Sequence, residues 1–348
     1  MKSFFATLLL CLFFTSPFVY CQTAVPAPGI DKVQFFKEES QLKVSLESYW
    51  GNLINKKNKI GLVFPGRFKG TLPDGKPVDE NVDLVVRGHF RREYCNLPPI
   101  KLQFKKSPTS VMAPLKSLKL VNVCKLNGSS EQNLLKEYLI YKMYNLLTDK
   151  SYRVRLLNVD FVDSSGKKGP GAQPAFLVED LSDLAKRNDC KEWNKRKVHA
   201  ESTDSKQMTL VSIFEYMIGN TDWSVPGDHN IKLIQIKSDS NSLPFAVPYD
   251  FDFSGIINTD YATPDPMLNT ETVTERVYRG FPRTMEEINE VLDIFKQKKD
   301  QIYAVVNNFE LLNSGSKKGM INYLESFYSL INKPKEVKSV FIDNARKQ

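Results

Sequence analysis

Hydrophobic residues alternate with polar residues through most of the first half of the chain. A period of two is typical of strands that bury one face, and turn residues separate the runs. Pro73-Asp74-Gly75 is one such separator and predicts a tight turn. The predicted strands lie at 42–46, 60–64, 82–86, 100–104, 154–161 and 175–178.

The apolar spacing changes to that of helices in four other segments. Ser129 with Gln132 and Thr284 with Glu287 have the spacing of a capping box, which predicts a helix start at each place. Gly219 follows an apolar run and predicts a helix end. The predicted helices lie at 129–147, 209–218, 284–307 and 318–331. Strands followed by helices predict an α+β protein with a strand-rich N-lobe and a helix-rich C-lobe.

The first residues predict export from the cytoplasm. Lys2 is the only charge before the apolar run Phe4 to Phe14, and polar or small residues follow it up to Cys21-Gln22. This order is typical of a signal peptide, here residues 1–21, and the run is shorter than the ~20 residues of a membrane span. An uncleaved anchor is the alternative. We therefore expect a secreted or periplasmic protein, cleaved near Cys21/Gln22, with no transmembrane segment in the mature chain.

The remaining chain divides into an N-terminal lobe, 22–178, and a C-terminal lobe, 179–348. Its composition favours an ordinary globular protein, with 41% apolar and 25% charged residues in the full sequence. The net charge is +8, spread along the chain, which indicates a solvated surface. Basic residues do not form a stripe with interleaved aromatics, so nucleic acid is not an expected partner.

Three cysteines remain after the signal peptide. An odd number in an oxidising compartment allows one disulfide and one free thiol. Cys95 and Cys124 flank a strand-like stretch and are the predicted pair, which leaves Cys190 free. With three histidines and no Cys-x-x-Cys motif, the sequence does not support a zinc site.

One phosphate-loop motif is incomplete. The stretch from Gly70 to Lys76 resembles a Walker loop, but Pro77 stands where the Ser or Thr that holds magnesium is required. The segment is better explained as a turn between strands.

Two loops of the second half carry residues suited to phosphoryl transfer. Asp222 and Asn230 precede a strand-like run, and Asp250 follows another run that begins at Phe245. A hairpin from Asn230 to Phe245 would bring the three side chains to one site. One carboxylate can deprotonate an attacking hydroxyl, while an Asn and a second carboxylate suit Mg²⁺ or Mn²⁺. Either Asp alone is better explained as a cap or turn residue; the ordered set favours function.

These loops resemble the catalytic loops of atypical kinases of the spore-coat CotH type. The resemblance extends to an Arg-Gly-x-x-Arg motif at Arg87–Arg91, a Lys-rich strand, a helix and a segment that joins the lobes. The matching segments are 86–92, 98–106, 134–147, 176–180 and 219–255. The resemblance implies a two-lobed atypical protein-kinase-like fold with an active site between the lobes.

The resemblance implies a role for each matching residue. Asp222 corresponds to the catalytic Asp. Asn230 and Asp250 correspond to the metal ligands. Asp252 stands where a standard kinase has Gly, so it could share the metal role of Asp250 or take it over.

Four more residues have implied roles in binding the phosphates of a nucleotide. Lys101 with Glu137 as its helix partner corresponds to the phosphate-binding pair, and Lys105 on the same strand face competes with Lys101. Arg87 and Arg91 suit phosphate oxygens, and surface ion pairing is the alternative explanation.

The resemblance therefore implies a secreted kinase-like phosphotransferase. It would use ATP or another nucleotide with Mg²⁺ or Mn²⁺ and move the γ-phosphoryl group to an unknown protein or other hydroxyl acceptor. The alternative is a non-catalytic, pseudokinase-like envelope or surface binding protein.

Overall fold

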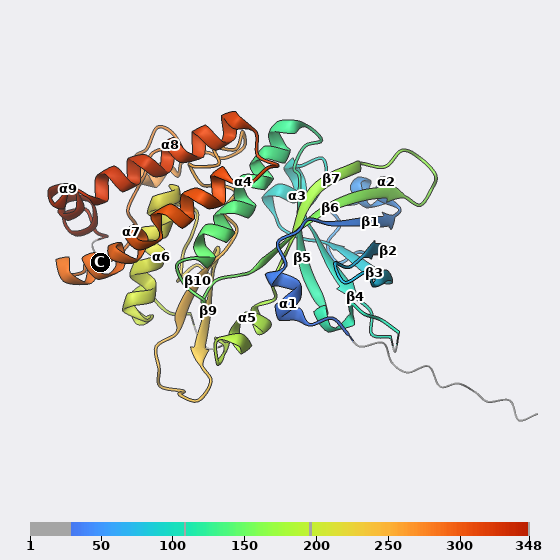
Figure 1. The fold of residues 1–348 in the computed structure, drawn as a ribbon, viewed down its shortest axis with the longest axis horizontal. Coiled ribbons are helices and arrows are strands. Elements are labelled where there is room, and N and C mark those ends of the chain that lie inside the picture. The colour runs from blue at the N-terminus through green and yellow to red at the C-terminus, as the bar shows by residue number, and fades with distance from the viewer. Residues whose placement is uncertain (1–28, 108, 195–196, 347–348) are drawn as a thin grey trace, which may run out of the picture.

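The structure is a computed structural model that describes residues 29–107, 109–194 and 197–346. Figure 1 shows a strand-rich part, formed by the first half of the chain, beside a helical part formed by the second half. The predicted signal peptide lies outside the described residues.

The strand-rich part is a closed barrel of seven strands in the order β1-β2-β3-β4-β5-β7-β6. β1 pairs with β6 in parallel, from Leu42 opposite Leu157 to Ser48 opposite Asp163, and the other neighbours are antiparallel. The strands are β1 (Leu42–Ser48), β2 (Val63–Thr71), β3 (Pro77–Val86), β4 (Ile100–Phe104), β5 (Ser117–Asn122), β6 (Val154–Asp163) and β7 (Gly171–Val178). Three short helices accompany them: α1 (Lys32–Lys37), α2 (Trp50–Asn55) and α3 (Phe90–Tyr94).

The predicted α+β fold with two kinase-like lobes is wrong. The parallel pairing of β1 with β6 closes the sheet into a mixed barrel, and this barrel with its helices is not the lobe arrangement of a kinase fold. Alternation along a chain shows that a segment is a strand but does not show which strand it pairs with.

Most of the predicted strands are confirmed, because their apolar positions fill the barrel. Leu46, Leu84 and Leu102 are fully buried and lie in one core with residues from every strand of the barrel. The strand predicted at 60–64 is wrong in its first half, since Ile60 is 83% exposed and β2 begins at Val63. β5 is not among the predicted strands.

The helical part combines six helices with a small sheet in the order β10-β9-β8, so its described residues are not helical throughout. The elements are α4 (Gly128–Asn145), α5 (Leu181–Arg187), β8 (Cys190–Glu192), α6 (Ser205–Ile218), β9 (Ile231–Ile236), β10 (Phe245–Pro248), α7 (Met285–Asn307), α8 (Ser314–Ile331) and α9 (Pro334–Lys338). Short 3-10 turns cover Ala113–Leu115, Ala200–Ser202 and Pro266–Leu268, and one π-turn covers Ser339–Asp343.

Local capping signals set most of the helix ends. The capping box of Thr284 and Glu287 is confirmed at the start of α7. Gly219 ends α6 in the left-handed conformation with φ 68°, as predicted. The cap predicted at Ser129 is wrong, because the Asn127 side chain accepts the Ser130 N–H and α4 begins at Gly128, directly after Asn127.

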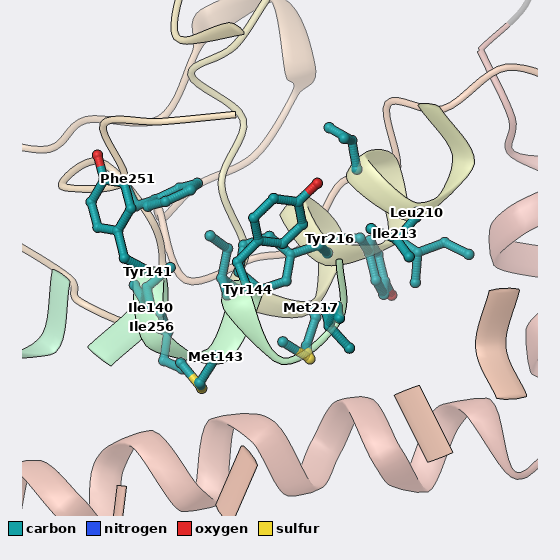
Figure 2. Close-up of a cluster of buried hydrophobic side chains, with 14 of the residues drawn as sticks. Ile140, Tyr141, Met143, Tyr144, Leu210, Ile213, Tyr216, Met217, Phe251 and Ile256 are labelled. Atoms are coloured by element: carbon teal, nitrogen blue, oxygen red, sulfur yellow. The ribbon is translucent and has the colours of Figure 1, made fainter. Parts of the chain in front are cut away.

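Helix α4 packs between the outer face of the barrel and the rest of the helical part. Its Tyr141 ring lies 4.8 Å from Phe251, and its Tyr144 ring lies 4.5 Å from Phe214 on α6. Figure 2 shows Tyr141, Tyr144 and Phe251 among the buried residues of α4, α6 and the loop after β10. The loop that carries Asp250 is therefore held against α4 by aromatic packing.

Two smaller predictions are confirmed. Cys95 and Cys124 form a disulfide, and Cys190 is a buried free thiol. The incomplete phosphate loop is a turn between β2 and β3, in which Gly75 has φ 83°. Among the residues that the structure describes, no helix combines the length and the apolar character needed to cross a bilayer.

Candidate functional site

Two loops lie side by side at one end of the β9–β10 hairpin. The first loop ends with Asn230 before β9, and the second begins with Tyr249 after β10. Ile231 pairs with Pro248 across the hairpin, and the Tyr249 N–H donates to the Asn230 carbonyl over 3.0 Å. The predicted hairpin is thus present, and it brings the two polar loops together.

Asp222 and Asn230 form one hydrogen-bonded unit. The Asn230 Nδ2 donates to the Asp222 carboxylate over 3.0 Å and to the Asp222 carbonyl over 2.7 Å. His229 Nε2 lies 2.8 Å from the other carboxylate oxygen. Because the amide nitrogen is engaged, the Asn230 Oδ1 is the atom available to a cation. The Asp222 side chain is 36% exposed, so a substrate can reach it.

Three residues of these loops have left-handed backbone conformations. Their φ angles are 52° at Asp228, 51° at Asn230 and 65° at Asp250. Asn and Asp tolerate this region better than other side chains, yet it costs about 1 kcal/mol or more at each residue. Such conformations cluster at functional sites, which supports a role for Asn230 and Asp250 beyond making a turn.

Asp250 faces the barrel across a buried electrostatic contact. Its N–H donates to the Tyr141 hydroxyl oxygen of α4 over 2.8 Å. Burial lowers the pKa of Arg87, which follows β3, and the Asp250 carboxylate opposes that shift. Asp250 thus supplies negative charge to a guanidinium that contacts little water.

Asp252, Arg91 and Tyr261 form a second polar group behind Asp250. The Tyr261 hydroxyl donates to Asp252 over 2.8 Å, and Arg91 Nη1 lies 3.8 Å from the same carboxylate. Burial and then repulsion from Asp250 raise the pKa of Asp252 to about 6, and Arg91 opposes the shift. Arg91 also donates to the Asn122 carbonyl over 2.6 Å, which fixes α3 to the end of β5.

Glu137 of α4 joins this second group instead of binding a lysine. It is 2% exposed, and its Oε1 has no hydrogen-bond partner among the described residues. Burial, followed by repulsion from Asp252 and Asp250, raises the pKa of Glu137 well above its usual value. The described residues contain no Lys101–Glu137 ion pair, so the expected pairing is absent, and Arg91 and Arg87 are the cations that face Glu137.

Three lysines line a cavity of about 170 Å³ between the barrel and the helical part, together with Glu179 and Asp180. One of them, Lys232, is also paired with Asp228 over 2.9 Å. Lys101 on β4 lies opposite Lys119 on β5, and Lys232 reaches the cavity from β9. Like charges directly opposite each other destabilise a sheet unless an anion lies between them. Burial, followed by repulsion from Arg87 and from the other two lysines, lowers the pKa of Lys119 to about 8 despite attraction from Asp250.

Lys119 is the main residue that the sequence analysis missed. Its Nζ lies 4.1 Å from the centre of the Tyr249 ring, and Tyr249 directly precedes Asp250. The alternation of Leu118 and Leu120 places Lys119 on the outer face of β5 and was the signal available in the sequence. Lys105 lies away from the site, since it is half exposed and pairs with Asp83 over 2.8 Å.

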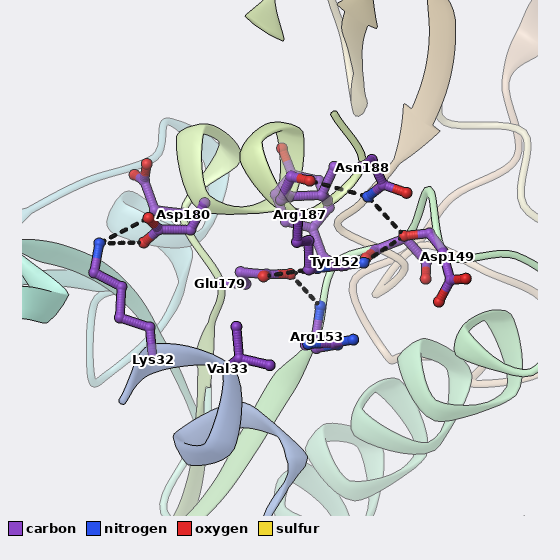
Figure 3. Close-up of polar contacts among 12 residues, drawn as sticks. Lys32, Val33, Asp149, Tyr152, Arg153, Glu179, Asp180, Arg187 and Asn188 are labelled. Carbon is purple, nitrogen blue, oxygen red and sulfur yellow. Dashed lines mark hydrogen bonds and ion pairs between the residues drawn. The ribbon is translucent and has the colours of Figure 1, made fainter. Parts of the chain in front are cut away.

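The segment that joins the two parts lines the same cavity and is rigidly held. Arg187 of α5 binds both carboxylate oxygens of Glu179 over 2.9 Å, and the Arg153 N–H donates to Glu179 over 3.1 Å. Asp180 caps α5 through its side chain. Figure 3 shows this network around Glu179. These hydrogen bonds tie the joining segment to α5 and to Arg153, which directly precedes β6.

The donor set at the loops suits a hard divalent cation. Carboxylate and amide oxygens from Asp250 and Asn230 are ligands that Mg²⁺ accepts together with water and phosphate oxygens. The described ranges contain no group of three or more His, Cys, Asp or Glu side chains that could hold a metal ion. Asp252 is engaged by Tyr261 and lies near Arg91, so it fits the metal role less well than Asp250.

The site thus has a partly exposed base, oxygen ligands and a cationic cavity. Asp222, Asn230 and Asp250 lie on the paired loops, Lys232 lies on β9 directly after the first loop, and Lys101 and Lys119 line the same cavity as Lys232 from the barrel. Comparison with protein-family models and with curated proteins finds no match for this chain.

Proposed function

We propose that this protein is a metal-dependent phosphotransferase that takes a nucleoside triphosphate as phosphoryl donor and a hydroxyl group as acceptor. The observation that carries the proposal is the convergence of Lys101, Lys119 and Lys232 on one cavity beside the Asn230–Asp250 loops. The proposal rests on this geometry and does not require a kinase fold.

The lysines and Arg87 would bind the phosphates of the donor. Lys119 is held in a cationic, water-poor environment, so a polyphosphate would relieve its repulsion from Lys101. Asn230 and Asp250 would hold a divalent cation, which neutralises phosphate charge when bound.

Asp222 would accept the proton of the acceptor hydroxyl. The acceptor oxygen forms a bond to the terminal phosphorus while the bond from that phosphorus to the bridging oxygen breaks, and the nucleoside diphosphate leaves. The hydrogen bond from Asn230 holds the Asp222 carboxylate in place, and its partial exposure leaves room for the acceptor.

The Cys95–Cys124 disulfide supports placing this activity outside the cytoplasm. A secreted or periplasmic location therefore remains part of the proposal, as does an unidentified protein or other hydroxyl acceptor.

The test has two measurements, both made with ATP and MgCl₂ or MnCl₂. Calorimetry measures nucleotide binding, and labelled γ-phosphate measures transfer to the protein itself and to candidate acceptors. We expect saturable, metal-dependent binding that Asp250→Ala abolishes and the exposed barrel variant Asp160→Ala retains. Binding without transfer would instead support a non-catalytic binding protein. Absence of binding with any nucleotide and metal would overturn the proposal.

A further inference from the structure

A carboxyl group is buried without a complete hydrogen bond directly behind the Asp222 loop. Glu215 lies in the last turn of α6 and is 1% exposed. Neither of its carboxyl oxygens has a hydrogen-bond partner in the part of the chain that the structure describes. An unpartnered buried carboxyl group is costly, so its presence calls for a compensating role.

Asn220 connects Glu215 to Asp222. The Asn220 N–H donates to the Glu215 carbonyl over 2.8 Å, and the Asn220 Oδ1 accepts the Asp222 N–H over 3.1 Å. Asn220 is itself 1% exposed, and its Nδ2, like the Glu215 oxygens, has no partner at hydrogen-bond geometry among the described residues; the two groups are still near enough for Asn220 to lower the pKa of Glu215. One side chain therefore contacts both the buried carboxyl and the backbone of the candidate base.

The charged groups that face Glu215 are Asp222 and Arg279. Arg279 donates to the Thr221 carbonyl, and its guanidinium lies 5.6 Å from the centre of the Trp223 ring. Burial raises the pKa of Glu215 to about 8; Asp222 adds to the shift, whereas Asn220 and Arg279 oppose it. At neutral pH the carboxyl group is therefore mainly neutral.

We propose that Glu215 is a positioning residue for Asp222, which it holds through Asn220 in the geometry needed to accept a proton. This inference rests on the proposed function, because it assigns Asp222 the role of base. In its neutral form Glu215 adds no second negative charge behind Asp222. In its ionised form it repels Asp222 and draws water toward the loop, so the positioning is lost above neutral pH.

The pH dependence of turnover tests the positioning role. We expect kcat of the wild type, measured at saturating ATP, to fall above about pH 8. Glu215→Gln should reduce that fall because its amide stays neutral, and the part of the fall that comes from deprotonation of Lys119 should persist. Glu215→Ala leaves Asn220 unsupported, and we expect it to lower kcat by on the order of a hundredfold with little change in KM. Glu80→Gln makes the same change at a buried glutamate of the barrel and should keep the wild-type profile. An unchanged alkaline limb in Glu215→Gln would overturn the proposal.

A second readout does not depend on transfer activity. Backbone amide resonances of Asn220 and Asp222 should shift together with one midpoint near the Glu215 pKa of about 8 in the wild type, and should not shift in Glu215→Gln. If no phosphoryl transfer is found but the resonances behave in this way, the proposed function fails and the link between Glu215 and the loop stands. If the resonances shift in Glu215→Gln as they do in the wild type, Glu215 does not act on the Asp222 loop, whether or not the protein is an enzyme.

Discussion

Lys101 and Lys119 are register partners on adjacent strands, with their ammonium groups on the same face of the barrel and beside the same cavity. Two like charges in this arrangement repel each other in the protein without a ligand. This repulsion therefore lowers the free energy of unfolding, and an anion bound in the cavity would raise it again.

Removing the Lys119 charge should stabilise the protein below about pH 8 and abolish anion binding. A lysine whose folded pKa is lowered from 10.5 to about 8 destabilises the fold while it is protonated, and that cost disappears as pH rises from about 8 to 10.5. We expect the free energy of unfolding of Lys119→Met at pH 7 to be higher than that of the wild type. The pKa shift sets an upper limit of about 3 kcal/mol, and the gain should be smaller than this because the Lys119 side chain is only half-buried. Urea unfolding at pH 7 and pH 10 measures the difference. Lys43→Met, on an exposed position of β1, should show no such pH dependence.

Breaking the Glu179–Arg187 pair should destabilise the connection between the two parts. The side chains are only 4% and 10% exposed, and removing one partner leaves a buried charge unpaired. We expect Glu179→Ala to lower the free energy of unfolding by about 3–5 kcal/mol. Glu336→Ala breaks the exposed pair with Lys333 and should cost less than about 1 kcal/mol. Equal losses for the two variants in urea unfolding would contradict this explanation.

Two glycine substitutions should act in opposite directions. Gly219 has a left-handed backbone, and a Cβ there would overlap the Tyr323 hydroxyl. We expect Gly219→Ala to destabilise by at least about 1 kcal/mol and to weaken nucleotide binding, because this residue begins the Asp222 loop. Gly319 lies within α8, where a Cβ meets no atom within 4 Å, so Gly319→Ala should stabilise by about 0.5–1 kcal/mol. Thermal unfolding of both variants checks the prediction.

Reduction of the disulfide should loosen α3 and its Arg91. Cys95 ends α3, and Cys124 accepts the Asn96 N–H over 2.9 Å beside the end of β5. The two cysteines are 29 residues apart, a separation for which loop closure predicts about 3–4 kcal/mol. We expect the Cys95→Ser/Cys124→Ser variant to lose this stability, while Cys190→Ser responds to reductant as the wild type does. A disulfide-free variant with wild-type Tm would refute the assignment.

The sequence predicted elements well where local interactions decide them. The Thr284 capping box, the Gly219 helix end and the hairpin after Asn230 depend on neighbouring residues, and all three are present. Ser129 failed as a cap because Asn127, two residues earlier, accepts the free N–H first.

Long-range pairing and electrostatics could not be predicted in the same way. The pairing of Leu42 with Leu157 closes the barrel, and the residues around either position do not indicate it, so the closed barrel was not predicted. Glu137 was assigned to Lys101 by resemblance, but the helix turns it toward Arg91 and Asp252. Lys119 lies on β5, which was not predicted as a strand, and its contact with the Tyr249 ring depends on a residue 130 positions later in the chain.

The parallel pairing of β1 with β6 also determines when the protein can acquire its final shape. β1 pairs with a strand about 115 residues later in the chain, and β7 between β5 and β6 follows that strand, so the barrel stays open until the chain up to Val178 has emerged from the ribosome. Contacts of such sequence separation form slowly. Until then the apolar inner face of β1 is not covered by the rest of the barrel, so the newly made chain is exposed to aggregation and can bind chaperones during synthesis.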